Sequence, residues 1–382
     1  MAGKRVVVLG GGFGGVAAAR TARALLGAEH EVALVDRQRR TYLCGALPQM
    51  VVGAWDALGA SRSLGLLANR GVRFVQAEVQ GIDTDARRVA TSAGALAYDY
   101  LVVALGATYD WDAVPGAREA YSFYSVETAR RLRRKLGALR RGRVVIAVAG
   151  VPYKCPPAPF EMAMLLDWAL RRRGVRRAVE LHLFTPEPAP LPVAGPEAGV
   201  RIRGALEERG IHLHTGAAVT EVRRHGRRAV FSDGTALEAA VVVTVPVHRA
   251  PPVVREAGLV GPSGWVEVAP RTLETGVPGV YAIGDVTLVP MANGRGLPKA
   301  GVFAASEGET VGRAIAAAIE GGAAPPFLGS GACFIAYSGT QAGLVAGEFL
   351  AEGQPAVRLE PPTARGMRAK ERFLRDWRRF RI

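Results

Sequence analysis

Apolar runs alternate with amphipathic stretches through the first third of the chain. An apolar run over residues 4–9 ends in glycines, an alanine- and arginine-rich stretch continues to about residue 26, and a second apolar run covers 31–35. Residues 72–105 favour strands and end in a continuous apolar run that Gly106 closes. Short apolar runs separated by helical stretches indicate buried parallel strands covered by helices.

The same alternation returns in the second part of the chain. The expected elements there are a basic helix over 130–141, strands over 144–148 and 180–184, a helix from Pro159 to Arg173, further strands near 211–215, 218–224, 227–232 and 241–247, and a long helix that opens at 297–301 and continues to about Ile319. Two such layers of strands and helices predict an α/β fold with two Rossmann-like, doubly wound domains.

A GxGxxG motif joins the first strand to the first helix through Gly10, Gly12 and Gly15. Glycines in this setting let the backbone approach a pyrophosphate at the helix N-terminus. Asp36 ends the second strand, where a carboxylate hydrogen-bonds the ribose hydroxyls of a cofactor that lacks a 2′-phosphate. The motif therefore predicts that FAD or NAD binds to the first domain.

The second Rossmann-like unit has no glycine motif at its strand-to-helix turn. Residues 151–157 read VPYKCPP, and prolines cannot offer the N–H groups that a pyrophosphate requires. NAD(P) is therefore not expected to bind there. The turn instead presents Cys155 beside Lys154, and a cation or a helix N-terminus lowers the pKa of a thiol. Cys155 is a candidate nucleophile; an inert cysteine in a turn is the alternative.

The chain has three cysteines, Cys44, Cys155 and Cys333, and no CxxC pair. Three scattered cysteines are too few for the disulfide framework of a secreted domain. They have to be explained one by one, and no metal site is expected.

Basic residues outnumber acidic ones by 49 to 34, and the isoelectric point is near 10.4. Such a balance favours anionic membranes, nucleic acid or acidic partners. Nucleic acid is not expected, because no basic patch with interleaved stacking aromatics occurs outside the C-terminal tail. No apolar run reaches the roughly 18 residues of a membrane-spanning helix, and no signal peptide is expected before the first strand.

The tail over residues 365–382 predicts an amphipathic helix. Phe373, Trp377 and Phe380 share one side of it and arginines cover most of the rest. This pattern favours peripheral attachment to an anionic membrane. The sequence does not indicate which face of the membrane is used. A helix that packs its aromatics against its own protein is the alternative.

Four motifs together resemble the sulfide:quinone oxidoreductases and the flavoprotein subunit of flavocytochrome c sulfide dehydrogenase. They are the glycine motif at 10–15, AIGD ending at Asp285, LPKAG at 297–301 and, most specific, KCPPAPFE at 154–161. The similarity extends over nearly the whole chain. It implies the two-dinucleotide-binding flavoprotein architecture, with FAD as the cofactor.

The resemblance also implies roles for individual residues. Cys155 and Cys333 match the two cysteines that flank the isoalloxazine ring as a redox disulfide or sulfur bridge. Glu161 matches a proton-handling glutamate; a residue favoured by the helix dipole is the alternative. The remaining cofactor-binding candidates are Gly106, Gly284 and Asp285. Lys299, at the start of a helix, is expected to stabilise negative charge on the reduced ring, with a solvated turn lysine as the alternative.

Cys44 matches the cysteine that carries FAD through an 8α thioether in the flavocytochrome branch, and a packed apolar cysteine is the alternative. That branch is normally exported by a leader, which is not expected here. Many sulfide:quinone oxidoreductases have a further cysteine before the KCPPAP motif, and none lies between Cys44 and Cys155. The electron acceptor therefore stays open.

The expected function is FAD-dependent oxidation of sulfide to sulfane sulfur or polysulfide through Cys155 and Cys333, with a membrane quinone as acceptor. The alternatives are a c-type cytochrome acceptor, a type II NADH:quinone oxidoreductase and a non-catalytic basic flavoprotein. A homo-oligomer is kept open. The expected domains are an FAD-binding domain over 1–107 and 246–320, a second Rossmann-like domain over 108–245 and a C-terminal segment over 321–382.

Overall fold

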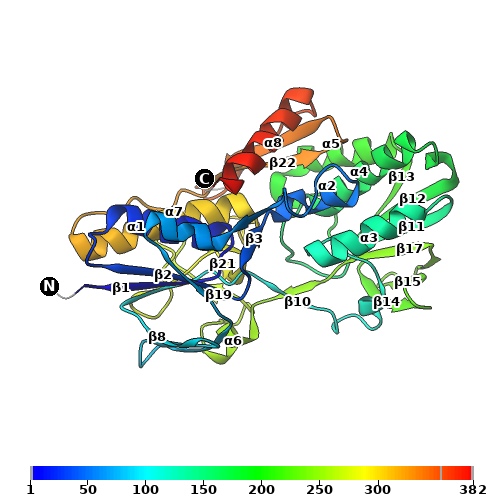
Figure 1. Cartoon of the computed structure of the whole chain (residues 1–382). Coiled ribbons are helices and arrows are strands. Elements are labelled where there is room, and N and C mark those ends of the chain that lie inside the picture. Colours follow the sequence, from blue (N-terminus) through cyan, green and yellow to red (C-terminus); the bar gives the residue numbers. More distant parts are fainter. Residues whose placement is uncertain (1–2, 353–354, 380–382) are drawn as a thin grey trace.

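The computed structural model describes residues 3–352 and 355–379. Its first sheet has five parallel strands in the order β20-β9-β1-β2-β5. Their bounds are β1 (Arg5–Leu9), β2 (Glu31–Asp36), β5 (Arg73–Gln76), β9 (Tyr100–Val103) and β20 (Val280–Ala282). The helices α1 (Phe13–Leu25) and α7 (Gly301–Glu320) lie side by side along this sheet (Figure 1).

Helices α1 and α7 approach each other almost backbone to backbone. A Cβ atom added to Gly308 of α7 would lie only 2.2 Å from the carbonyl oxygen of Gly14. Only glycine therefore fits at this crossing, which sets α7 directly against the start of α1.

The second sheet has four parallel strands in the order β13-β12-β11-β17. Its strands and the helices of one face are β11 (Gly142–Val148), β12 (Val179–Thr185), β13 (Ile211–Thr215), β17 (Val241–Val245), α3 (Val126–Ala138), α4 (Ala158–Arg172) and α5 (Pro196–Glu207). The opposite face packs on a small antiparallel sheet of β14 (Val219–Arg223), β15 (Arg228–Phe231) and β16 (Ala236–Glu238). Alternate strand residues thus enter two separate hydrophobic cores.

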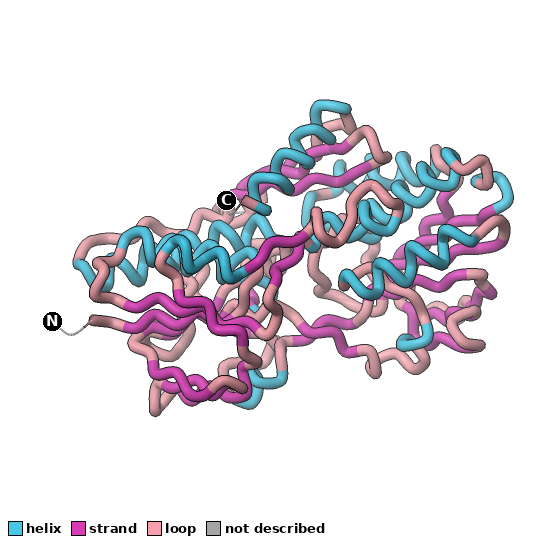
Figure 2. Tube along the Cα trace, in the orientation of Figure 1, coloured by secondary structure: helices cyan, strands magenta, loops and turns pink. Residues whose placement is uncertain are grey.

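The remaining elements connect or extend these two sheets. They are β3 (Arg40–Tyr42), η1 (Cys44–Ala46), α2 (Leu47–Val51), β4 (Ser61–Ser63), β6 (Val79–Asp83), β7 (Arg88–Thr91), β8 (Gly94–Ala97), β10 (Thr108–Asp110), β18 (Val247–Arg249), α6 (Pro252–Glu256), β19 (Val266–Glu267), η6 (Gly284–Val286) and β21 (Thr287–Leu288). Strands β10 and β18 pair antiparallel and form the extended connection between the two sheets (Figure 2).

The C-terminal segment is an antiparallel sheet with one helix on it. It consists of β22 (Ser330–Ala336), β23 (Ala342–Glu348), β24 (Ala356–Leu359) and α8 (Ala364–Arg378). Apolar residues of β22 and α8 belong to the same core as those of the second sheet. Figure 1 shows α8 lying across the region between α7 and α4.

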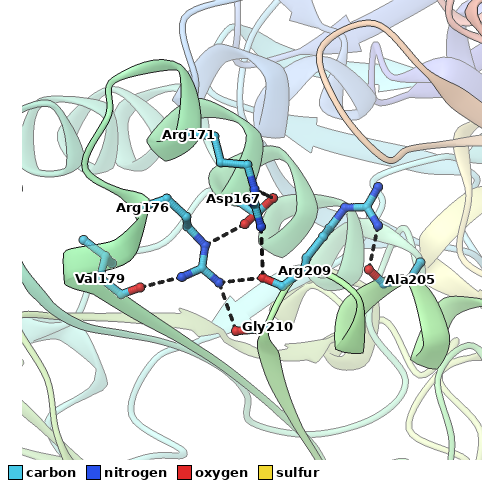
Figure 3. A network of polar contacts seen from close by, with 7 residues as sticks. All are labelled: Asp167, Arg171, Arg176, Val179, Ala205, Arg209 and Gly210. Carbon is cyan, nitrogen blue, oxygen red and sulfur yellow. Dashed lines mark hydrogen bonds and ion pairs between the residues drawn. The ribbon is translucent and has the colours of Figure 1, made fainter.

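A polar network fixes the outer end of the second domain (Figure 3). Asp167 of α4 is buried and accepts hydrogen bonds from Arg171 at 2.8 Å and from Arg176 at 2.6 Å. Arg176 also donates to the carbonyl oxygens of Val179 and Arg209, both at 2.7 Å. One carboxylate therefore ties the end of α4 to the start of β12 and to the turn before β13.

The predicted α/β fold with two Rossmann-like sheets is confirmed. The basic helix begins earlier than expected, at Val126, because Ser125 caps it through a hydrogen bond from the Thr128 N–H, and it ends at Ala138. The domain limits at 107, 245 and 320 remain predictions; each falls at the end of an element or in a loop beside one.

The prediction for the tail is corrected at Trp377. Its side chain is buried, with a ring centroid 4.6 Å from that of Phe13, so it is not available to lipid. Phe373 is half-buried and packs near Phe334, while Phe380 and Arg381 lie outside the described residues. The apolar side of α8 therefore packs against the rest of the protein. Among residues 3–352 and 355–379, no helix is long and apolar enough to cross a membrane.

Candidate functional site

A cavity of about 740 Å³ is lined by both Rossmann-like domains and by the C-terminal segment. Its wall includes nearly all the predicted site residues: Gly10, Gly12, Asp36, Cys44, Gly106, Cys155, Gly284, Asp285, Lys299 and Cys333. The two exceptions, Gly15 and Glu161, lie behind the wall. The structure therefore gathers into one site residues that are spread over the whole chain.

The glycine motif forms one part of the wall. A Cβ atom at Gly15 would lie 1.8 Å from the carbonyl oxygen of Gly10, so glycine lets α1 start directly against β1. At Gly12, the N-cap of α1, a Cβ atom would meet nothing within 4 Å, and the backbone is open to the cavity. The positive end of α1 therefore faces a cradle that a phosphate can enter.

Asp36 lies where β2 ends, beside this cradle. Its carboxylate accepts hydrogen bonds from the N–H groups of Gly11 at 2.6 Å and Gln38 at 2.7 Å. Burial raises the pKa of Asp36, and the two hydrogen bonds oppose that shift. Asp285 in η6 is a second carboxylate in the cavity wall. Burial raises its pKa, and the positive charges of Lys154 and Lys299 oppose this increase.

These features fit FAD. The open glycine cradle suits the diphosphate, Asp36 suits the ribose, and Gly106 and the N-terminal end of α7 line the rest of the cavity. A bound flavin supplies a two-electron acceptor.

Cys155 and Cys333 are hydrogen-bonded to each other, both as free thiols. Cys155 lies in the loop before α4, with φ of 55°, and its N–H donates to the carbonyl oxygen of Lys299 at 2.7 Å. Cys333 lies in the middle of β22. The two thiols come from different domains and interact at the wall of the same cavity.

A nearby cation or helix N-terminus would lower the pKa of Cys155, but the structure raises it. The hydrogen bond between the thiols is the largest influence on both: it raises the pKa of Cys155 and lowers the pKa of Cys333. Burial adds to the increase at Cys155 and opposes the decrease at Cys333. Cys333 is therefore the more acidic thiol of the pair.

Glu161 lies behind the thiols in a buried ion pair with Lys370. One carboxylate oxygen accepts from the Lys370 ammonium, and the other accepts from the N–H of Ala336 at 3.1 Å. The two side chains are only 3% and 4% exposed. The positive charge of Lys370 lowers the pKa of both cysteines, and the negative charge of Glu161 raises it.

Sequence reasoning missed Lys370, which is one of the many basic residues of the tail. A signal was present: Lys370 shares its helix face with Met367, Leu374 and Trp377, which are all buried. A lysine on the apolar side of an amphipathic helix needs a buried partner.

The two lysines that line the cavity, Lys299 and Lys154, face different groups. The ammonium of Lys299 donates to the carbonyl oxygens of Asp285 at 2.9 Å and Thr287 at 2.8 Å, and it lies 3.5 Å from the ring centroid of Trp265. Lys154 lies over the ring of Tyr109 at 4.9 Å. Burial lowers the pKa of Lys154, but Cys44, Tyr109 and Asp285 outweigh burial and leave it raised, so its charge is held firmly.

Cys44 opens η1 and is half-buried in the cavity wall. Among the described residues, the thiol donates one long hydrogen bond, 3.8 Å from Sγ to the carbonyl oxygen of Tyr42. The thiol therefore remains available to a molecule in the cavity.

The turn that would hold a second dinucleotide is filled by Tyr153. Its side chain is 3% exposed, and its hydroxyl donates to the carboxylate of Glu187 at 2.9 Å. Glu187 lies two residues after the end of β12, whereas Asp36 is the last residue of β2 in the first sheet. The acidic residue that would meet a ribose is thus engaged by a tyrosine.

Comparison with known proteins places this site in context. The family model described as pyridine nucleotide-disulphide oxidoreductase matches residues 4–318. The mitochondrial sulfide:quinone oxidoreductase of Mus musculus is 26% identical over 304 residues, which are 75% of this chain and 66% of that protein. An NADH dehydrogenase-like protein of Mycobacterium tuberculosis is 32% identical over 313 residues, 75% of this chain and 74% of that protein.

A solved structure agrees with the fold over nearly the whole chain. The X-ray structure of the sulfide:quinone oxidoreductase from the hyperthermophilic bacterium Aquifex aeolicus has a TM-score of 0.87 at 24% identity. The match covers 98% of this chain and 92% of that chain.

Replacing the ion pair with neutral groups should make Cys333 less acidic. The double variant Glu161→Gln with Lys370→Met leaves no buried charge behind the thiols. Lys370 lowers the pKa of Cys333 more than Glu161 raises it, so the loss of both charges should raise this pKa. The rate of its alkylation by iodoacetamide, followed by peptide mass mapping against pH, should therefore rise at higher pH than in the wild type. Arg368→Met on the exposed side of α8 is the control, and an unchanged profile in the folded double variant would show that the pair does not act on the thiols.

Proposed function

The chain belongs to the pyridine nucleotide-disulphide oxidoreductase family, and within this family we propose that it is an FAD-dependent enzyme that oxidises sulfide and passes the electrons to a membrane quinone. The observation that carries the proposal is the hydrogen-bonded pair Cys155–Cys333 in the wall of the cofactor cavity. The named sulfide:quinone oxidoreductases among its relatives support the same assignment.

The thiol pair accounts for the sulfur chemistry when its oxidised form is a disulfide. Hydrosulfide attacks the sulfur of Cys155, the S–S bond breaks, and Cys333 leaves as the thiolate because it is the more acidic thiol. Cys155 then holds a persulfide. A second hydrosulfide releases a hydrodisulfide from Cys155, so that two hydrosulfides become one hydrodisulfide, one proton and two electrons.

A bound flavin would accept the electron pair. The surrounding residues hold the charges that this reaction moves. Lys370 stabilises the thiolate of Cys333, Glu161 keeps Lys370 in place and is the candidate acceptor for the released proton, and Lys154 places a fixed positive charge in the cavity wall.

A second candidate function is oxidation of NADH, which the NADH dehydrogenase-like relative favours. The filled turn at Tyr153 argues against it, because the prolines of this turn and the Tyr153–Glu187 hydrogen bond occupy the place of a second dinucleotide. We therefore prefer sulfide as the electron donor.

Anaerobic sulfide should bleach the flavin absorbance of the wild-type holoenzyme, and a quinone should restore it. Cys155→Ser and Cys333→Ser should each lose the sulfide-dependent bleaching by at least about 100-fold, because no persulfide can be exchanged, yet both should still be reduced by dithionite. Rapid bleaching by NADH without a response to sulfide would favour the second candidate. Reoxidation by a c-type cytochrome but not by quinone would reassign the acceptor.

We also propose that Cys44 lies beside the dimethylbenzene edge of FAD and bonds to its 8α carbon. The proposal rests on the free thiol of Cys44 in the cavity wall, near the cation of Lys154. Acid precipitation of the holoenzyme should leave the yellow colour in the pellet, and Cys44→Ser should release it into the supernatant. Colour that stays wholly in the wild-type supernatant would rule out the bond.

Attachment to an anionic membrane is proposed through charge and not through the buried Trp377. Exposed arginines follow the outer side of α8 at spacings of three and four residues: Arg365, Arg368, Arg372, Arg375 and Arg379. Each basic residue near an anionic surface contributes about 1 kcal/mol.

Changing Arg365, Arg368 and Arg372 to glutamine should weaken binding to phosphatidylserine-containing vesicles by roughly 100-fold at low salt. The matched control changes three exposed arginines of α3, namely Arg130, Arg133 and Arg134, and should leave binding nearly unchanged. Equal losses in a vesicle co-sedimentation assay would mean that net charge alone governs binding, and no loss in either would end the membrane role of α8.

A further inference from the structure

Glu307 is a buried carboxylate that the sulfur chemistry does not use. It lies in α7 and is 2% exposed, and one of its oxygens accepts a hydrogen bond from the N–H of Gly284. Gly284 begins η6, the short turn that presents Asp285 to the cofactor cavity.

The opposite side of the same turn is held by Lys299. Its buried ammonium donates to the carbonyl oxygens of Asp285, in the middle of the turn, and of Thr287, directly after it. The turn is therefore held from two sides. Glu307 accepts from a backbone N–H at its start, and Lys299 donates to backbone carbonyl oxygens within it and directly after it. A small void of about 10 Å³ beside Gly284, Thr287, Lys299 and Glu307 has room for about one water molecule.

Glu307 lies close behind the cavity wall. Ala304, three residues before it in α7, lines the cavity, and one such step in a helix is about 4.5 Å. The ionisable groups that act on Glu307, among the described residues, are Asp285 from η6 and Lys299 from the segment before α7. Helix α1, packed on the other side of α7, meets it at this level with Gly14 and Ala17 and Ala18.

We infer that Glu307 takes up a proton when the bound flavin is reduced, and thereby offsets the negative charge that the flavin gains. A flavin that accepts two electrons and one proton becomes more negative by one unit. In a site of low dielectric constant this charge disfavours a second negative charge nearby, so the Glu307 carboxylate binds one proton and becomes neutral.

The ionisation of Glu307 supports this role. Burial raises its pKa to about 7, a shift that the Gly284 N–H opposes and Asp285 reinforces. The group is therefore protonated below pH 7 and ionised above it, and a negative flavin raises its pKa further. An extra proton is thus bound on reduction only above about pH 7. Lys299, whose pKa burial lowers to about 8, is still protonated at the start of this range and cannot supply the same uptake there.

The proton count on reduction tests the inference without sulfide. The holoenzyme is reduced by dithionite in a redox titration of the flavin absorbance, and the midpoint potential is measured between pH 6 and pH 9. The wild type should show a steeper pH dependence above about pH 7, by one further proton per two electrons. Glu307→Gln keeps an oxygen for the Gly284 N–H and should lose the additional proton. Glu309→Gln, two residues further and exposed, is the matched control and should behave as the wild type.

An identical pH dependence in wild type and Glu307→Gln would overturn the inference. If Glu307→Gln fails to retain FAD, the reduced-minus-oxidised infrared spectrum of the wild type decides at pH 8. A new carbonyl band of a protonated carboxylic acid is expected there, and its absence would equally overturn the inference. Because dithionite replaces sulfide, this outcome is independent of whether sulfide is the physiological donor.

Discussion

The buried ion pair between Glu161 and Lys370 joins three segments that are distant in the sequence. Glu161 belongs to α4 and Lys370 to α8, and the Ala336 N–H adds β22 to the same carboxylate. Removing two charges from water costs several kcal/mol for each, and pairing with full hydrogen bonding offsets that cost. Helix α8 therefore cannot leave the protein without exposing an uncompensated buried carboxylate. The pair fixes β22, and with it Cys333, opposite the loop that carries Cys155.

The cofactor cavity lies between two such pairs of opposite charge. Glu161 and Lys370 lie behind the thiols, and Glu307 and Lys299 hold the turn of Asp285. The Glu161–Lys370 ion pair is neutral as a whole, so it imposes no large field on the cavity. A group that responds when charge moves nearby is found at each pair: the thiol of Cys333 adjoins the first, and the carboxyl of Glu307 belongs to the second. Lys154, whose charge is held by its surroundings, is the fixed cation among them.

The second Rossmann-like domain keeps its scaffold while its strand-to-helix turn serves another purpose. The parallel sheet and the Asp167 network preserve the positions of β11 and α4. The turn between them lies at the carboxyl end of a strand, where open α/β sheets place their ligands. Proline and Tyr153 remove the nucleotide cradle from that place, and Cys155 stands there instead.

The sequence alone determined the fold class and the glycine motif with Asp36, and it made Cys155 a candidate nucleophile. These follow from local patterns: the spacing of apolar residues, the conformational freedom of glycine and the missing N–H of proline. Tertiary structure decided which thiol is acidic, where Lys299 points and what Trp377 packs against. An amphipathic helix has the same sequence pattern whether lipid or protein covers it. The partner of Lys370 lies 209 positions away, and no local pattern encodes a contact across that separation.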